Sequence, residues 1–180
     1  MMASSRDRSR PPAIAMVTRR VHPAHGPGGL ERHVYELVVH LARRGVEVDL
    51  FSAAPLTRSR RDAAEQVFPP GVQPHWVADR WLPLGDRPGT VVVDRVTNYP
   101  LWSCQVARRI LSHREPSGRL RWPVVHAHGL AGWGLARSAE RRVAGAALVL
   151  TTHGMEEFRA HQWMKRWAYA PFRACMRTTA

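Results

Sequence analysis

Three short stretches of the 180-residue chain combine residue types that could do chemistry: residues 26–29, 126–129 and 153–157. The first places two adjacent glycines, Gly28 and Gly29, directly before a predicted helix. Because glycine lacks a Cβ atom, a phosphate group could approach the backbone N–H groups there and meet the positive end of the helix dipole. A turn that only lets the chain enter the helix explains the same glycines, so both interpretations stay open.

The glycine stretch does not match the common nucleotide-binding motifs. Residues 26–31 read Gly-Pro-Gly-Gly-Leu-Glu and so lack the third glycine of GxGxxG. The chain also contains no GxxxxGKS or GxxxxGKT sequence. Because these motifs mark nicotinamide, flavin and P-loop nucleotide sites, the sequence disfavours all three, and we expect no cofactor.

Two histidines, His126 and His128, alternate on a predicted strand. Their side chains therefore point to the same side of the sheet, and His128 lies nearest the carboxyl edge. A metal site needs at least three ligands of suitable geometry, and the spacing dictates no third donor, so we expect no metal here. Hydrogen bonds to backbone carbonyls and contacts with a substrate hydroxyl or phosphate are the two remaining interpretations.

A third histidine, His153, follows the next predicted strand, with Glu156 and Glu157 just beyond it. Two acidic side chains at the start of a helix commonly complement the helix dipole. A catalytic carboxylate is the alternative interpretation of the same pair.

The composition indicates one globular domain. Hydrophobic residues make up 44% of the chain and charged residues 23%, which excludes a disordered tail, a collagen and a coiled coil. The apolar run at residues 146–150 is far shorter than the roughly 20 residues that span a bilayer, and residues 1–10 are too polar to begin a secretory signal. Two cysteines without a CxxC pattern suggest neither a disulfide framework nor a structural zinc site. We therefore expect a cytoplasmic protein.

The formal net charge of +13 raises nucleic acid as a partner. However, the basic residues are almost all arginines, scattered in pairs along an Ala-, Gly- and Pro-rich chain, which also fits a base-composition bias in the coding DNA. We expect no nucleic-acid binding.

The elements that must position these residues alternate between strands and helices. Residues 1–12 form a predicted disordered leader and residues 13–180 one domain. Predicted strands cover residues 13–17, 46–51, 74–78, 123–128 and 147–152, and predicted helices cover 30–41, 98–112, 131–142 and 158–177, the last kinked near Pro171. Residues 54–73 read as a mobile loop with a short helix near 62–67, residues 79–88 as irregular, and residues 91–93 fit either a strand or a helix start. This alternation predicts an α/β fold with a doubly wound parallel sheet, whose ligands bind at the carboxyl ends of the strands.

Three segments in order resemble a known family. Residues 15–17 leading through Gly28-Gly29-Leu30-Glu31-Arg32-His33-Val34 into residues 37–41, 44–48 and 51 look like the opening of the retaining glycosyltransferases of family 4. Val124-Val125-His126-Ala127-His128-Gly129 and Val149-Leu150-Thr151-Thr152-His153-Gly154 resemble the next two signatures of that family. The resemblance covers residues 13–177, and its specificity comes from the ordered set.

The resemblance implies a GT-B architecture, in which two Rossmann-like domains face each other across a cleft, and sugar transfer from a nucleotide-sugar donor with retention, usually without a required metal. Gly28 and Gly29 would offer backbone N–H groups to the donor diphosphate, and His128 would lie beside the reacting sugar as the catalytic residue. His153 and Glu156 would line the acceptor side. The acceptor itself is unknown.

The same resemblance implies a C-terminal domain that holds the donor and carries paired glutamates, and we expect this second domain to be absent from the chain. The chain is then an N-terminal, acceptor-side half, as a fragment, a truncated reading frame or one part of a split enzyme. The missing domain is accordingly an expected partner, and the isolated chain is expected to be inactive.

Two other interpretations remain. In the first, the chain is a binding module whose terminal helix makes peripheral contact with an anionic membrane. The aromatic residues Trp163, Trp167 and Phe172 beside Arg166 and Arg173 suggest this contact, and a place in the core is the alternative role of those aromatic residues. In the second, the chain is a catalytically silent remnant.

Overall fold

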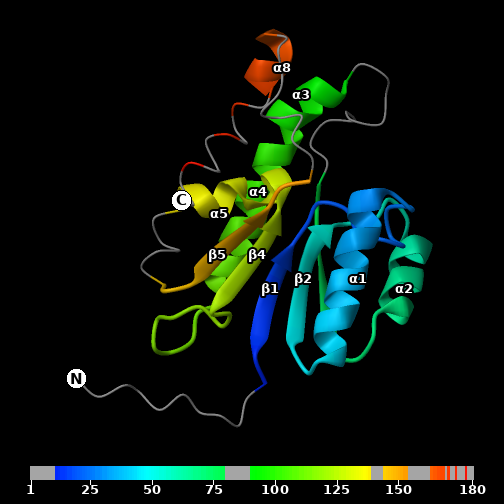
Figure 1. Cartoon of the computed structure of the whole chain (residues 1–180), viewed down its shortest axis with the longest axis vertical. Helices are drawn as coiled ribbons and strands as arrows, with labels where there is room; N and C mark the ends of the chain where they lie inside the picture. Colours follow the sequence, from blue (N-terminus) through cyan, green and yellow to red (C-terminus); the bar gives the residue numbers. More distant parts are fainter. Residues whose placement is uncertain are drawn as a thin grey trace.

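The computed structural model describes residues 11–79, 90–138, 144–153 and 163–168, together with residues 170, 173 and 177. Five parallel strands form one sheet in the order β3-β2-β1-β4-β5 (Figure 1). The strands are β1 (Ala13–Val17), β2 (Glu47–Ala53), β3 (Val72–Val77), β4 (Val124–His128) and β5 (Ala147–Thr151). The predicted doubly wound, Rossmann-like sheet is confirmed, and its strand order reverses between β1 and β4. The predicted leader lies largely outside the described residues.

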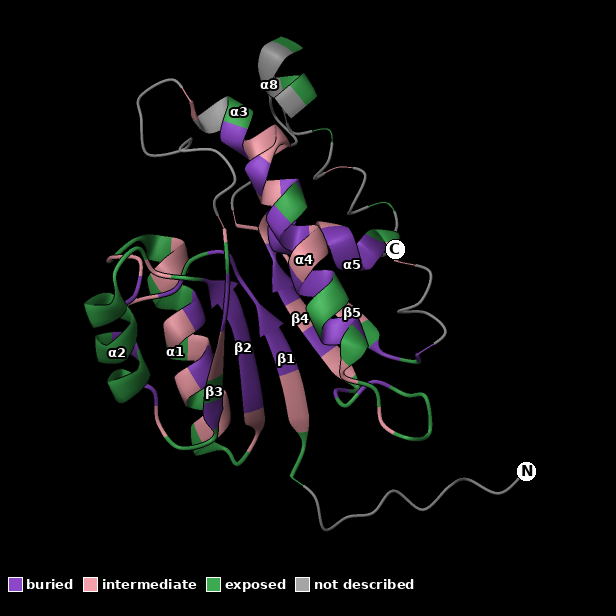
Figure 2. Cartoon of the chain, turned by 180° about the vertical axis from the view of Figure 1, so that it is seen from behind, coloured by how far each residue is buried: buried purple, intermediate pink, exposed green. Residues whose placement is uncertain are grey.

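Helices cover both faces of the sheet. One face carries α1 and α2, which pack over β1, β2 and β3, whereas α4 and α5 lie on the opposite face beside β4 and β5 (Figure 2). The helical segments are α1 (Gly29–Arg43), α2 (Arg58–Val67), α3 (Val91–Val96), α4 (Asn98–Ser112), the 3-10 segment η1 (Gly129–Gly132), α5 (Trp133–Arg137) and α8 (Trp163–Ala168). The core therefore has two parts, one on each face of the sheet.

The sequence pattern explains the first crossover, from β1 through α1 to β2. The predicted apolar stripe of α1 packs into the core cluster on its face of the sheet, with Val34 and Val38 fully buried. The helix ends before Gly45, whose φ of +79° is a conformation that only glycine adopts without strain. The chain then enters β2 directly, which pairs in parallel with β1.

The short helix predicted near residues 62–67 is confirmed as part of α2, whereas the mobile loop predicted around it over residues 54–73 was wrong. A helix, α2, begins at Arg58, and the hydroxyl of its N-cap residue Thr57 accepts a hydrogen bond from the Arg60 amide. Next, β3 begins at Val72 and includes Pro74. That strand lies at the edge of the sheet, where a residue without an N–H group costs no pairing.

The predicted helix over residues 131–142 is divided. The chain forms η1 and then α5, and residues 139–143 lie outside the described residues. The Ser103 hydroxyl of α4 donates to the Ala131 carbonyl and accepts from the Gly134 amide, both at 2.8 Å. A Cβ atom on Gly134 would lie 2.5 Å from the Ser103 carbonyl oxygen, so the two helices approach closely at this glycine.

Three further predictions have mixed outcomes. Helix α4 occupies the predicted residues 98–112, and the ambiguous residues 91–93 begin helix α3. The helix predicted over residues 158–177 falls mostly outside the described residues, although α8 lies within it.

One buried carboxylate, Asp49 of β2, lies on the sheet face that α4 partly covers. Its Oδ1 atom is 2.5 Å from His75 Nε2, its Oδ2 atom accepts from Trp122 Nε1 at 2.7 Å, and Arg121 Nη2 is 3.4 Å away. Burial opposes ionisation, but the hydrogen bonds from His75 and Trp122 and the charge of Arg121 outweigh it and lower the pKa of Asp49. The carboxylate therefore ties β3 and the approach to β4 to the middle of the sheet.

We predict that Asp49→Asn lowers the free energy of unfolding by about 2 kcal/mol at neutral pH, because the amide carries no charge and presents an NH2 donor to one of the two donors that the carboxylate accepts from. The folded-state pKa of Asp49 lies below the unfolded value of 3.8. Its stabilising contribution is thus complete above pH 3.8 and is lost as the pH falls through the folded-state pKa. Urea unfolding of both proteins across acidic pH measures this difference.

The matched control is Asp62→Asn, since Asp62 is exposed on α2 and its carboxylate lies 3.9 Å from Arg58 Nε. Such a surface pair contributes at most about 1 kcal/mol. Equal effects of the two substitutions at neutral pH would contradict the role assigned to Asp49.

Candidate functional site

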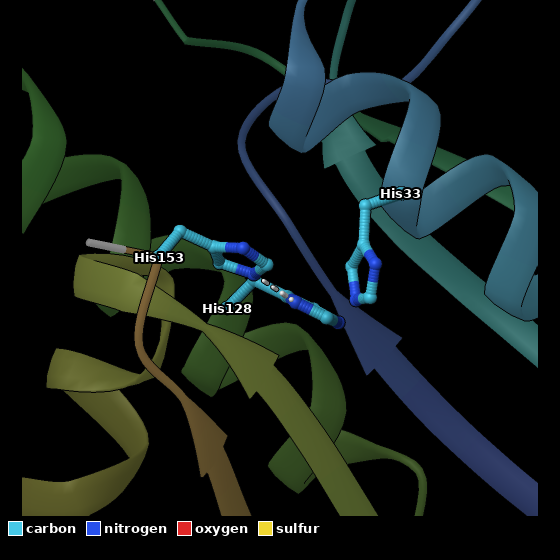
Figure 3. Close-up of side chains that lie close together, drawn as sticks. All are labelled: His33, His128 and His153. Atoms are coloured by element: carbon cyan, nitrogen blue, oxygen red, sulfur yellow. Dashed lines mark hydrogen bonds between the residues drawn. The ribbon is translucent and has the colours of Figure 1, made fainter.

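Three histidines from separate elements meet at the carboxyl edge of the sheet (Figure 3). His33 lies on α1, His128 is the last residue of β4, and His153 follows β5. This edge is the switch point of the sheet, where the connections after β1 and β4 leave in opposite directions and ligands bind in proteins of this architecture. We call His33, His128 and His153 the histidine cluster.

The rings of the histidine cluster are in contact. A hydrogen bond of 2.7 Å joins His128 Nδ1 and His153 Nε2, and these two rings are stacked with their centroids 5.0 Å apart. The His33 ring stands edge-on to both, at 6.0 Å from His128 and 5.2 Å from His153. One ring nitrogen of each residue lies within 4.8 Å of the others.

Residues beneath the cluster fix the His128 ring. The His128 side chain is fully buried, and its Nε2 atom lies 3.1 Å from the sulfur of Met16 on β1. His126 stacks on His128 at 4.6 Å, and its own Nε2 atom lies 2.7 Å from Thr151 Oγ1 on β5. The register of β1, β4 and β5 thus determines where the His128 ring lies.

The environment favours neutral rings. Burial, followed by repulsion from His126, His153 and His33, lowers the pKa of His128 to about 3. Burial and neighbouring histidines also lower the pKa of His126 and of His153. At neutral pH each of these three imidazoles therefore carries one N–H group and one lone pair, which suits hydrogen bonding to a hydroxyl or binding to a metal ion.

Gly28 and Gly29, which we call the glycine turn, lie at the amino end of α1, the helix that carries His33. Gly28 is the N-cap of α1 in an extended conformation and provides no side-chain cap, and both Gly28 and Gly29 are exposed. The first four amide groups of a helix have no acceptor within it, so they are available to an anion. The predicted glycine turn and the histidine edge are therefore joined by the first turns of a single helix.

An acidic side chain lies beside this turn. A Cβ atom built on Gly28 would be 2.0 Å from Glu31 Oε2, so the Glu31 carboxylate folds back over the N-cap residue. Such a position complements the positive end of the helix dipole. Any bound anion must displace this carboxylate or lie to one side of it.

A buried arginine, Arg19, anchors the connection that leads from β1 to the glycine turn. Its guanidinium group donates to Asp94 on α3 at 2.5 and 2.9 Å and to Asp79 after β3 at 2.9 Å. Tyr99 of α4 lies against the same group, 4.7 Å from ring centroid to Cζ. Because Arg19 is only 8% exposed, these partners balance a charge that burial would otherwise penalise heavily.

Sequence reasoning found only part of this site. The structure brings the predicted residues His128 and His153 together and places Gly28 and Gly29 on the same edge. His33 was missed as a third donor, although it stands one helical turn after Gly29 on a helix predicted to begin at this edge. Nothing in the sequence pairs Arg19 with its distant acidic partners. The predicted residue Glu156 lies outside the described residues.

Solved structures show the same fold. Sucrose-phosphate synthase from Thermosynechococcus elongatus superposes with a TM-score of 0.54 and 14% identity over 92% of this chain and 40% of that chain. TcCGT1 in complex with UDP superposes with a TM-score of 0.51 and 14% identity over 80% of this chain and 28% of that chain. The chain therefore spans less than half the length of either protein.

Sequence comparison identifies the family. No curated protein matches the chain. The sequence profile described as Glycosyltransferase Family 4 matches residues 27–180, which include the glycine turn, the whole histidine cluster and all strands after β1. Because this match covers most of the chain, the chain belongs to glycosyltransferase family 4.

Proposed function

We propose that the chain is the acceptor-side domain of a retaining enzyme that transfers a hexosyl-type sugar from a nucleotide-sugar donor to an acceptor hydroxyl. The observation that carries the proposal is the path of α1, which begins at the exposed glycine turn and brings His33 to His128 and His153. Family membership supports a transferase, and the UDP bound to TcCGT1 supports a nucleotide donor. The nucleotide sugar is a co-substrate, and no cofactor takes part in the transfer.

In this proposal the glycine turn stabilises the leaving group. A diphosphate gains negative charge as its bond to the sugar breaks, and fixed N–H donors at Gly28 and Gly29 lower the energy of that state. The absence of side chains on these residues leaves space for the phosphate oxygens. The Glu31 carboxylate turns away when the donor binds, because two anions would otherwise share one helix end.

His128 lies beside the reacting sugar. Both of its nitrogens are occupied in the structure, Nδ1 by His153 and Nε2 by the Met16 sulfur. A sugar hydroxyl would replace His153 at Nδ1, since His153 is only half-buried and follows the end of β5. His153, and Glu156 beyond the described residues, then line the acceptor side.

The rest of the cleft comes from a second domain that holds most of the donor. The lengths of the two structural neighbours support this part of the proposal, because the chain spans 28% and 40% of them. This organisation explains why we propose that the isolated chain is inactive. The backbone N–H groups of the glycine turn form only one side of the cleft, and they cannot by themselves hold the nucleotide sugar and the acceptor together.

The function is tested with the protein joined to, or mixed with, a domain that binds a nucleotide sugar. We expect sugar transfer from the completed protein and none from the purified chain. His128→Ala should lower kcat/KM by on the order of 100-fold, the lower end of the cost of removing one preorganised hydrogen-bonding group from a reacting centre.

The control for His128→Ala is His40→Ala, at an exposed position further along α1, which should leave turnover unchanged. Thermal melts of both variants separate loss of activity from loss of fold. Transfer by the chain alone, or full turnover in the folded His128→Ala variant, would refute the proposed roles.

Gly29→Ala tests the diphosphate contact separately. No atom lies within 4 Å of a Cβ built at Gly29, and the residue is helical, so the fold should keep its stability to within about 0.5 kcal/mol. The new methyl group would nevertheless stand where the phosphate approaches. We expect the KM for the donor to rise about tenfold, a loss of about 1.4 kcal/mol, with an unchanged KM for the acceptor. An unaltered donor KM removes Gly29 from the site.

A second candidate function is contact with an anionic membrane. Trp163 and Trp167 of α8 are 77% and 64% exposed, and Arg166 between them is also exposed. The alternative that these two tryptophans belong to the core is therefore wrong, while Phe172 lies outside the described residues. No helix among the described residues has the length and apolar character needed to cross a bilayer. Exposed tryptophans beside arginine favour the membrane surface.

Co-sedimentation with vesicles tests this contact. The chain should bind vesicles that contain anionic lipid and bind neutral vesicles several-fold less, and Trp163→Ser with Trp167→Ser should abolish the difference. Leu56→Ser is the matched control, because Leu56 is 63% exposed but lies far from α8 in the sequence. Binding that does not depend on lipid charge or on the two tryptophans excludes the membrane contact.

A further inference from the structure

We propose that the histidine cluster, His33, His128 and His153, binds a divalent transition-metal ion of the zinc class. The ion would occupy His128 Nδ1, the atom that a sugar hydroxyl takes in the proposed transfer, so the two ligands would compete and the ion is tested without donor or acceptor. It rests on the convergence of three ring nitrogens from three elements at one point of the sheet edge (Figure 3).

The distances suit one shared ion. Zinc binds histidine nitrogens at about 2.0–2.1 Å in tetrahedral geometry, which places two such nitrogens roughly 3.4 Å apart. In the structure the nitrogens of His128 and His153 are 2.7 Å apart, and all three ligand atoms lie within 4.8 Å of one another. A small opening of the hydrogen-bonded pair and a rotation of the exposed His33 ring bring all three to the same ion.

The chemistry of the cluster favours a metal over an ion pair. Within the part of the chain that the structure describes, the groups found to act electrostatically on His128 and His153 are other histidines, with no carboxylate among them. Three clustered rings repel one another when protonated, whereas three neutral rings offer three lone pairs to a cation. Imidazole nitrogen is a preferred ligand of zinc, copper and nickel.

The surroundings complete the arrangement. When His128 binds an ion through Nδ1, its proton resides on Nε2, which faces the Met16 sulfur at 3.1 Å, a weak acceptor. The His126 ring stacks on the His128 ring and restricts the orientation of its plane. Such supporting contacts orient metal ligands in known sites. Three histidines leave the fourth position of a tetrahedral ion open to water.

The test uses the whole 180-residue chain after treatment with a chelator. Calorimetric titration with Zn²⁺ alone should give one ion per chain, and Co²⁺ should give the visible absorption bands of a tetrahedral nitrogen site. Zn²⁺ should raise the melting temperature, because an ion that binds the folded state stabilises it. His33→Ala should weaken Zn²⁺ binding by about 100-fold or more, because it removes a direct ligand. Loss of a residue that only supports a ligand typically weakens metal binding by roughly 10- to 100-fold.

His40→Ala is the matched control, since both histidines are exposed on α1 and only His33 reaches the cluster. This variant should bind Zn²⁺ and Co²⁺ like the unaltered chain, which separates the site from adventitious binding by the ten histidines. Because His33 is exposed, its replacement should leave the melting temperature of the metal-free chain unchanged. Absence of saturable binding, or equal binding by the two variants, would overturn the proposal.

Discussion

The reversal of strand order between β1 and β4 is the constraint on which the site depends. Adjacent parallel strands whose connections leave to opposite faces open a crevice at their carboxyl ends. Here Met16 of β1 and His128 of β4 contact each other across that crevice. The chain that follows β1 runs to α1, which packs on the face of the sheet where Met16 lies. The glycine turn and His33 reach the same edge because α1 begins where the connection that leaves β1 at this edge, residues 18–28, ends.

Buried charge holds that connection in place. Arg19 lies two residues beyond β1 and is enclosed by Asp94 and Asp79, which come from separate segments of the chain. Such a cluster adds little net stability, because removing the charges from water costs about as much as their attraction returns. Its contribution is geometric: the contacts with Asp94 and Asp79 hold Arg19, and with it the start of the connection to α1, in place.

The sequence was sufficient for the parts governed by local periodicity. The stripe of α1, the glycine that ends it, and the buried strands β1 and β4 follow from spacing alone. The sequence was insufficient where contacts between residues far apart in the chain determine the local structure. Ser103 divides the helix predicted after β4, Thr57 begins α2 earlier than the apolar residues suggest, and Asp49 is buried because Trp122 and His75 donate to it. His33 belongs with this second group, since only the folded chain shows that α1 turns it toward β4.

The charge balance at the carboxyl edge of the sheet also indicates which domain of the proposed enzyme binds most of the donor. A helix end supplies the equivalent of about half a positive charge, while a diphosphate carries at least two negative charges in its vicinity. Next to the glycine turn, the exposed Arg32 adds one positive charge and Glu31 one negative charge, while the rings of His128 and His153 are neutral at pH 7. Most of the compensating charge must then come from outside this edge. That requirement supports a domain that positions the acceptor and contacts only one side of the donor.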